Sequence, residues 1–443
     1  MRVLFTTQPA SGHLHPLVPL ARALDDAGHA VAVCSAPSFR SEVEAFGLVH
    51  IDAGLDWLAS DRSTWGTFPP LPPPGPEFIK FGVATWADVT ARAMIPDLLA
   101  IAREWEPDLI VREGMEYGGC VAAECLGIPH ASVAINTYGA LDSPDVHHIA
   151  GNRLLVGAAL SRHREEHGLP PDPDVRMPFR HLHLCFTPPR WDGDGAARPA
   201  NTRFVRHTST EWPGAPPLDW LGGLPDRPTV LASLGTVFNK TPGVLEAIIA
   251  GLGGETVNVI VAIGPGQDPT RFGRTPANVR LEAYVPQARL LAHCDLFITH
   301  GGFNSVKQAL SEGVPMVIVP ISADQPYSAE RCVALGVAEA IDPGARSPNA
   351  IRAVARKVLG HASYRASARR FQAEMAALPD SKEVVKLLQA LGGRTVANSV
   401  PATATPQQRP RRLVAPRSGE TLSPQGSEVH QPHGDQRTEA SRW

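Results

Sequence analysis

The stretch with the clearest chemistry is Asp295 to Ser305, where an apolar strand leads through His300, Gly301 and Gly302 into a helix. Two glycines at a strand-to-helix turn let another molecule approach the backbone closely. The N-terminus of the helix then offers unpaired N–H groups and a partial positive charge to an anion. His300 adds a hydrogen-bond donor, and Ser305 adds a hydroxyl. This arrangement predicts a cradle for a diphosphate.

A polar loop after the next strand extends the predicted site. Helix Ser305–Glu312 should end at Gly313, and strand Met316–Val319 should lead into a loop that carries Asp324 and Gln325. In open α/β sheets, ligands bind outside the carboxyl ends of the strands. A carboxylate and an amide together suit the hydroxyls of a sugar. The two segments therefore predict a pocket for a diphosphate and a polyol.

The order His300-Gly-Gly-Phe-Asn-Ser305, Gly313-Val-Pro-Met316 and Asp324-Gln325 resembles the donor-binding signature of GT-B glycosyltransferases. These nucleotide-sugar enzymes modify plant secondary metabolites and bacterial macrolides, enediynes and aromatic polyketides. Matching pieces recur from the N-terminus to about Gly393. The resemblance implies an α/β fold of two Rossmann-like, doubly wound parallel-sheet domains that face each other across a crevice.

Two other segments extend the donor site. Small hydroxyl residues around Gly235, after a buried strand, allow phosphate to approach the backbone. Tyr284-Val-Pro-Gln287 resembles the base-recognition stretch, and Gln308 stands where many relatives have a ribose-binding glutamate. Because an amide lacks the charge-assisted strength of a carboxylate, the choice between UDP and dTDP stays open. The donor set is Ser233, Gly235, Thr236, Val285, Gln287, His300, Gly301, Gly302, Asn304, Ser305, Gln308, Asp324 and Gln325.

The loop Gly12-His13-Leu-His15-Pro16, after the first strand, is the second candidate site. Imidazole titrates near neutrality and can take the proton of an attacking hydroxyl. In the family the histidine of a Gly-His-x-x-Pro loop is the general base, and His13 matches that position. His15 is the competing histidine.

A base histidine needs an acceptor that orients its other ring nitrogen. The family has an aspartate at the end of the strand that follows a Pro-Asp turn, here Pro107-Asp108. Glu113 aligns best with it and is one methylene longer, and Glu116 is the second candidate. The alternative is that Glu113 pairs with an arginine, such as Arg112, on a solvated loop.

The chain as a whole fits a two-domain globular protein. Its 443 residues exceed one average core, and a formal net charge of −3 gives no reason to expect nucleic acid or an anionic membrane as partner. The six cysteines lack the close pairs of zinc or redox motifs. Neither a signal peptide nor an apolar run of membrane-spanning length is evident. We expect a cytoplasmic protein, monomeric or homodimeric, without stable membrane insertion.

Alternating strand and helix patterns divide the chain. We expect an acceptor-binding domain over 1–212 with a returning helix at 380–392, a linker over 213–226, and a nucleotide-sugar-binding domain over 227–379. Two stretches, Pro69–Pro76 and Pro144–Pro178, read as irregular loops that either carry specificity or form solvated excursions. Residues 394–443 are rich in Pro, Ser, Arg and Gln and should be disordered.

These features together predict inverting transfer of a hexose or deoxyhexose from a UDP- or dTDP-sugar to a hydroxyl of a small, mostly apolar natural product. No metal or other cofactor is expected, because the helix N-terminus and His300 can neutralise the leaving diphosphate. The alternatives are a sugar-nucleotide epimerase of the same fold and a catalytically silent partner that activates another transferase. A dehydrogenase or triphosphatase is disfavoured, since neither Gly-x-Gly-x-x-Gly after the first strand nor a Walker loop is present.

Overall fold

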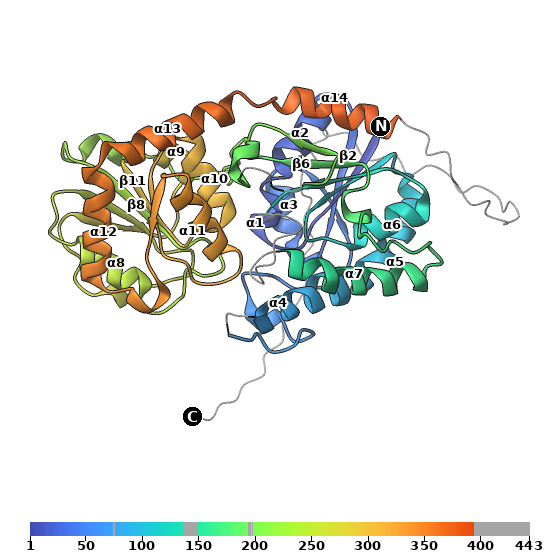
Figure 1. Cartoon of the computed structure of the whole chain (residues 1–443), viewed down its shortest axis with the longest axis horizontal. Coiled ribbons are helices and arrows are strands. Elements are labelled where there is room, and N and C mark those ends of the chain that lie inside the picture. The colour runs from blue at the N-terminus through green and yellow to red at the C-terminus, as the bar shows by residue number, and fades with distance from the viewer. Residues whose placement is uncertain (74–75, 136–148, 194–195, 197, 394–443) are drawn as a thin grey trace, which may run out of the picture. The chain divides into compact units, whose positions relative to one another are not determined.

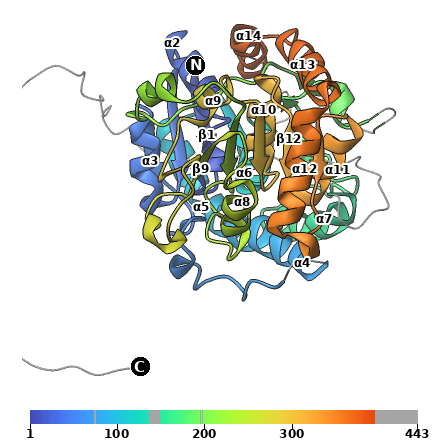
Figure 2. The ribbon, with the colours of Figure 1, turned by 90° about the vertical axis from the view of Figure 1, so that its left-hand side faces the viewer.

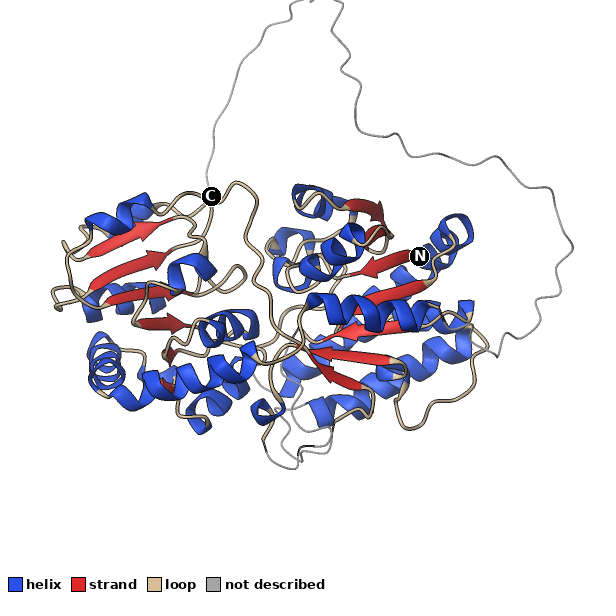
Figure 3. Cartoon of the chain, turned by 90° about the horizontal axis from the view of Figure 1, so that it is seen from above, coloured by secondary structure: helices blue, strands red, loops and turns tan. Residues whose placement is uncertain are grey.

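The computed structural model describes residues 1–73, 76–135, 149–193, 196 and 198–393 (Figure 1). Residues 394–443, which were predicted to be disordered, lie outside these ranges. Positions 74–75 and 144–148 of the two predicted loops also lie outside them. The described chain contains two separate groups of parallel strands with helices on both faces (Figure 3). The predicted two-domain α/β fold is therefore confirmed.

The first sheet has seven parallel strands in the order β3-β2-β1-β4-β5-β6-β7. They are β1 (Arg2–Thr6), β2 (Ala30–Ser35), β3 (Val49–Asp52), β4 (Leu109–Glu113), β5 (His130–Val133), β6 (Leu182–Cys185) and β7 (Thr202–Phe204). Its helices are α1 (Ser11–Leu14), α2 (Val18–Asp26), α3 (Arg40–Ala45), α4 (Pro76–Val83), α5 (Thr90–Trp105), α6 (Gly118–Leu126), α7 (Ile149–Glu166) and α14 (Ser381–Gly392).

Alternating residues of β1 explain why helices cover both faces of this sheet. Val3 and Phe5 pack in the core formed with α2 and α14, whereas Leu4 packs on the opposite face with α5 and α6. Successive side chains of a strand point to opposite faces, and strands buried on both faces read as continuous apolar runs. The returning helix α14 completes this first core through residues such as Val384 and Leu388.

The second sheet has six parallel strands in the order β10-β9-β8-β11-β12-β13. They are β8 (Thr229–Ser233), β9 (Asn258–Ala262), β10 (Val279–Glu282), β11 (Leu296–Thr299), β12 (Met316–Ile318) and β13 (Ala338–Ala340). Its helices are α8 (Val244–Leu252), α9 (Gln287–Leu291), α10 (Phe303–Ser311), α11 (Gln325–Ala334), α12 (Pro348–Gly360) and α13 (Ala362–Ala376). Helices α8 and α12 pack together on one face (Figure 2), and α9, α10 and α13 share the core on the other.

Each sheet has one point at which the strand order reverses. In the first sheet this point lies between β1 and β4, and in the second between β8 and β11. Ligands of doubly wound sheets bind beyond the carboxyl ends of the strands at such a point. The loops that follow β1, β4, β8 and β11 therefore define where the site lies.

Several elements depart from the sequence-based expectation. The stretch Pro144–Pro178, expected as a loop, contains the 18-residue helix α7. Its buried residues Val156, Ala159, Leu160 and His163 follow helical spacing, a pattern hidden by the many His, Arg and Pro around it. Strands β3, β6, β7 and β13, each of three or four residues, were not anticipated.

Within the stretch predicted as the linker, 213–226, Trp220 and Leu221 pack against the second core. Trp212, just before it, packs against the first core. Among the described helices, none combines the length and apolarity that crossing a bilayer would require.

Candidate active site

The loop after β1 presents His13 from a short helix. Strand β1 ends at Thr6, and α1 begins at Ser11, with the amide of His13 bonded to the carbonyl of Ala10 (2.9 Å). Buried Leu14 anchors this helix in the first core. The His13 side chain is 20% exposed, so its imidazole is held by the protein and still reachable.

Glu113 orients this imidazole from the neighbouring strand. It is the last residue of β4, which pairs with β1 in a register that sets Thr6 opposite Arg112. Its Oε1 lies 3.0 Å from Nδ1 of His13, and its Oε2 accepts the amide of Met115 (2.6 Å). The carboxyl group is fully buried, so its contact with Nδ1 leaves Nε2 as the nitrogen that can accept a proton.

Glu116, the second candidate, has different partners. Its carboxyl group accepts hydrogen bonds from the Thr6 hydroxyl and from the amide of Gly119 (2.9 and 3.1 Å) at the start of α6. Burial raises the pKa of Glu116, which favours its neutral form. The geometry therefore joins Glu113, and not Glu116, to His13.

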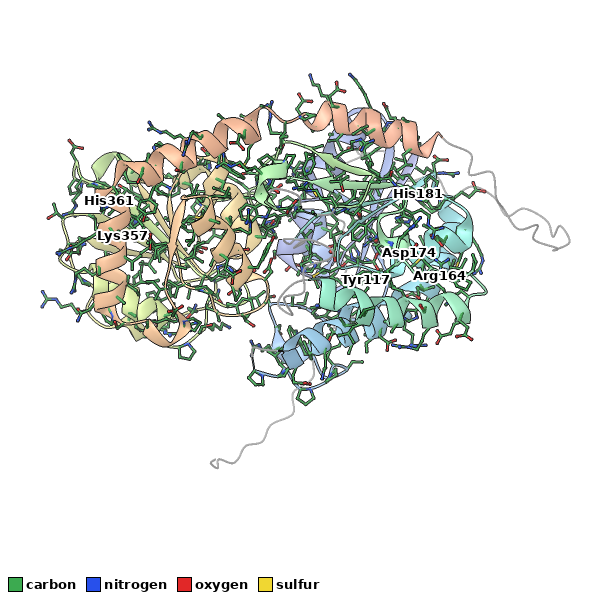
Figure 4. All side chains as sticks on the ribbon, in the orientation of Figure 1. Tyr117, Arg164, Asp174, His181, Lys357 and His361 are labelled. Carbon is green, nitrogen blue, oxygen red and sulfur yellow. The ribbon has the colours of Figure 1, made fainter. Side chains whose placement is uncertain are left out.

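The alternative of a solvated pair between Glu113 and Arg112 is wrong, because both side chains are buried. The Arg112 guanidinium donates to the backbone carbonyls of Glu113, Gly114, Glu116 and Pro178. It also lies 5.7 Å from the ring centroid of Tyr117, which Figure 4 labels beside α7. Arg112 thus ties the turn after β4 into a fixed shape.

His15 points into the first core. Its ring packs edge-on against Phe46 with the centroids 5.5 Å apart, and burial lowers its pKa to about 4. A histidine with this pKa stays neutral at pH 7. Of the two histidines of this loop, His13 is the one in contact with an acidic partner.

In the second domain, His300 follows β11 and is wrapped by glycines. A Cβ on Gly235 would lie 2.8 Å from Cε1 of His300, and one on Gly302 would lie 2.5 Å from Nε2. Gly235 also has φ +71°, so both space and backbone conformation require glycine there. Burial lowers the pKa of His300 to about 4. An imidazole with this pKa is neutral near pH 7.

The other residues predicted in the loops after β8 and β11 lie close to His300. Ser233 ends β8 opposite Thr299 of β11, and its Oγ accepts the amide of Gly235 (3.3 Å). Thr236 is exposed. Gly301 has φ +88°, and a Cβ there would lie 2.7 Å from Ile318. The carboxyl ends of β8 and β11 thus bring the predicted phosphate-binding residues together.

Helix α10 contacts the loop that carries His13. Nδ2 of Asn304, in its first turn, donates to the carbonyl of Gly12 (2.6 Å), the residue before His13. Ser305 is buried beside it. Sequence reasoning assigned Asn304 to the donor alone, whereas its amide spans the two domains over 292 positions of the chain.

The residues predicted near the base and ribose are also adjacent. Nε2 of Gln287, the first residue of α9, donates to Oε1 of Gln308 on α10. Val285 is buried two residues before Gln287. The amide at position 308 is therefore oriented by a second amide, a partner that the sequence did not indicate.

Asp324 and Gln325 occupy the start of α11 and have different surroundings. Asp324 is the residue before the helix and is half-buried, whereas Gln325 is buried. Oε1 of Gln325 accepts the amides of Ile321 (2.7 Å) and Ser322 (2.8 Å). This amide oxygen therefore holds the shape of the loop.

An aromatic cluster beside His13 was missed by sequence reasoning. The ring of Trp86 lies 6.3 Å from that of His13, and Trp57 backs it at 5.2 Å. Trp65, Phe68 and Phe81 complete the cluster. We call these five residues the aromatic wall. Three of the eight tryptophans of the chain, all within 57–86, were the available signal.

A short π-helix, Ala84–Val89, presents Trp86. The backbone carbonyl of Trp86 accepts a hydrogen bond from the hydroxyl of Thr90 (3.0 Å). That hydroxyl accepts a hydrogen bond from Nε2 of Gln8 (2.9 Å), in the loop after β1. Single π-helical turns inside α-helices are frequent at functional sites. The half-buried Trp86 ring is thus held in register with the loop of His13.

Two doubly wound sheets, one bearing a paired histidine and the other a His-Gly-Gly helix N-terminus, define a glycosyltransferase of the GT-B class. Profiles of the erythromycin biosynthesis protein CIII-like N-terminal and C-terminal domains match residues 78–160 and 246–391, respectively. The chain belongs to this family of natural-product glycosyltransferases.

Individual relatives cover most of the chain. The chain is 30% identical to 4′-demethylrebeccamycin synthase of Lentzea aerocolonigenes, over 88% of this chain and 99% of the relative. It is 32% identical to L-demethylnoviosyl transferase of Streptomyces niveus, over 88% and 98%. Among solved structures, glycosyltransferase VinC in complex with dTDP is similar at a TM-score of 0.72 and 27% identity, covering 88% of this chain and 99% of VinC.

Proposed function

We propose that this glycosyltransferase moves a hexose or deoxyhexose from a nucleoside-diphosphate sugar to a hydroxyl of a small, mostly apolar acceptor, with inversion at the anomeric carbon. The observation that carries the proposal is the buried contact of Glu113 with His13, one residue from the point where Asn304 of α10 holds Gly12. This arrangement supports a base in the first domain that acts beside a diphosphate bound by the second.

In this mechanism Nε2 of His13 takes the acceptor proton as the oxygen attacks the anomeric carbon. The Glu113 carboxylate accepts from Nδ1–H, fixes the tautomer and stabilises the imidazolium that forms. The acceptor oxygen bonds to carbon while the bond from carbon to the diphosphate breaks on the opposite face. Attack from the face opposite the leaving group inverts the configuration.

The leaving diphosphate would be stabilised by the second domain. The N-terminal amides of α10, the neutral imidazole of His300 and the hydroxyl of Ser305 supply donors where charge develops. Asp324 and the NH₂ of Gln325 would meet sugar hydroxyls, and the Gln287–Gln308 pair the ribose. We propose that no metal takes part, so chelation should leave the rate unchanged.

For the nucleotide, we favour dTDP over UDP. VinC was solved with dTDP, and the 25% identical glycosyltransferase SsfS6 of Streptomyces sp. SF2575 was solved with thymidine diphosphate. The uncharged Gln308 leaves the ribose contact less selective than a carboxylate would.

The aromatic wall supports an apolar acceptor. Trp86 offers a partly exposed ring next to His13, and Trp57 and Phe68 behind it are buried. Burial of an apolar acceptor against such rings would position its hydroxyl at the base.

Neither relative described above is named as an epimerase or as a partner protein, and no structural observation favours those alternatives. A transfer assay separates the three readings. The chain is incubated with dTDP-glucose or UDP-glucose and a panel of apolar alcohols and phenols. Mass spectrometry detects the glycoside, and proton NMR reports its anomeric configuration.

The proposal expects release of nucleoside diphosphate only with acceptor, and a β-glycoside from the α-linked donor. His13→Ala should lower this rate by about 10²–10⁴-fold without changing dTDP binding. An α-product, acceptor-independent release, or a near-wild-type rate in His13→Ala would contradict it.

A further inference from the structure

Helix α10 carries a lysine that the proposed mechanism does not use. Lys307 lies one turn after Phe303 and is 0% exposed. Its Nζ lies 4.8 Å from the ring centroid of Phe303 and 5.0 Å from that of Phe186, which follows β6 in the first domain. The ammonium group therefore lies between the Phe303 ring of the second domain and the Phe186 ring of the first.

This environment is costly for a charged group. Within the described ranges, Nζ of Lys307 has no hydrogen-bond partner. Two ring faces attract a cation but replace only part of the hydration that it loses on burial. An apolar side chain would fill the same space without this penalty, so folding alone does not account for a lysine at this position.

Three titratable side chains interact with Lys307 among the described residues. They are Cys185 at the end of β6, His207 after β7 and Asp324 before α11. Burial raises the pKa of the Cys185 thiol, and burial together with the Lys307 charge lowers that of His207 far below its usual value. Both groups are thus neutral near pH 7. Asp324 remains as the opposite charge, and it belongs to the proposed sugar-binding loop.

The lysine is also close to the proposed diphosphate. Lys307 lies five positions after Gly302, which is about 7.5 Å along a helix axis. Burial lowers its pKa to about 7, against the opposing effect of Cys185 and Asp324. A nearby anion in surroundings of low dielectric favours the protonated amine. The protonation state of Lys307 can therefore respond to what binds at the N-terminus of α10.

We propose that Lys307 is a buried counter-charge of the donor site, and that binding of a nucleotide-sugar diphosphate draws a proton from solvent onto its amine. This inference rests on the proposed function, because it takes α10 as the diphosphate helix. Linkage makes the effect reciprocal: a protonated Lys307 tightens donor binding by the same factor by which the donor favours its protonation.

The test is calorimetric titration with dTDP-glucose and with UDP-glucose between pH 6 and 8.5. Each probe carries its diphosphate as a diester, which has no group that titrates in this range. Repeating each titration in buffers of different ionisation enthalpy measures the protons taken up. Because the His13 imidazole also lies near the cradle, the difference between wild type and variants carries the assignment.

The wild type should take up a fraction of a proton, and its affinity should fall about tenfold from pH 6 to 8.5, the effect of unit charges about 10 Å apart at a dielectric constant near 20. Lys307→Met should bind more weakly at pH 6 and lose both effects. Lys307→Arg, which stays charged, should keep affinity and lose the pH dependence. Lys357→Met is the control. Lys357 lies on helix α12 (Figure 4) and pairs with Glu339 of β13, so this variant should behave as wild type.

Equal proton uptake and equal pH dependence in wild type and Lys307→Met would overturn the counter-charge. Binding of neither sugar nucleotide at millimolar concentration would overturn the proposed function, and the counter-charge with it. The two failures are therefore distinguishable in one set of titrations.

Discussion

The carboxylate of Glu113 lies 3.0 Å from Nδ1 of His13, although 100 positions separate them in the chain. His13 lies in the loop after β1, and Glu113 is the last residue of β4. These two strands are neighbours because the strand order of the first sheet reverses between them. The sheet therefore assembles the pair.

Removing the charge of Glu113 should impair catalysis and spare donor binding. Glu113→Gln keeps the size of the side chain but cannot stabilise an imidazolium, so kcat should fall about 10²–10⁴-fold. Glu113→Asp should fall about 10–10²-fold because the carboxylate is withdrawn from Nδ1. Glu116→Gln is the control and should keep a near-wild-type rate. Equal losses of kcat in Glu113→Gln and Glu116→Gln would show that the orienting role does not belong to Glu113 alone.

Asn304 should affect turnover more than a surface contact between the same domains does. Asn304→Ala removes the bond to Gly12 and frees the catalytic loop from α10, so kcat should fall about tenfold or more. The comparison is Arg190→Ala, which removes an exposed ion pair with Glu374 of α13. That pair should change the rate by less than about twofold. Similar rates for both variants would show that the Gly12 contact does not position the base.

Glycine at position 235 should be needed by the donor site and not only by the backbone. Gly235→Ala introduces a Cβ 2.8 Å from the His300 ring at a φ of +71°. Gly254→Ala is matched in backbone, with φ +81°, but meets nothing within 4 Å. Gly254→Ala should lose about 1 kcal/mol of stability through its backbone alone, and Gly235→Ala should lose more because its Cβ also displaces the His300 ring. Only Gly235→Ala should also lose most of the rise in melting temperature on dTDP addition, as seen in a thermal shift assay.

The aromatic wall should distinguish flat from puckered acceptors. We expect 2-naphthol to bind more tightly than its saturated analogue decahydro-2-naphthol, because only the flat ring can stack on Trp86. Trp86→Ala should weaken 2-naphthol about tenfold by equilibrium dialysis and affect the saturated alcohol less. Trp220→Phe, in the second core, should leave both affinities unchanged. Equal losses for the two ligands would indicate simple apolar contact without stacking.

The stability of the donor-free protein should carry the signature of Lys307. Its pKa falls from 10.5 to about 7 on folding, so between these values the unfolded chain binds more protons and stability rises with pH. Lys307→Met removes the penalty and should raise the free energy of unfolding at pH 6 by an amount on the order of a few kcal/mol. The gain should shrink between pH 7 and pH 9.5 in chemical denaturation. A variant less stable than wild type at pH 6 would mean that the ammonium stabilises the fold.

Patterns within short segments of the chain were enough to predict the fold class, both strand-to-loop motifs and the family. These features are local: apolar runs, glycines at turns and polar residues at strand ends lie within a few positions of one another. The alternation of strands and helices then brings the ends of parallel strands to one edge. His13, His300 and the donor loops could therefore be proposed before any contact was known.

Which distant residues meet became known only from the packing of the folded chain. In the folded chain Glu113 contacts His13, whereas Glu116 accepts a hydrogen bond from the start of α6. Asn304 donates to Gly12, and Lys307 lies between one aromatic ring of each domain. Such pairings depend on side-chain direction and on packing between segments up to 292 positions apart. Spacing along the chain does not encode them, because a shift of one residue turns a strand side chain to the other face.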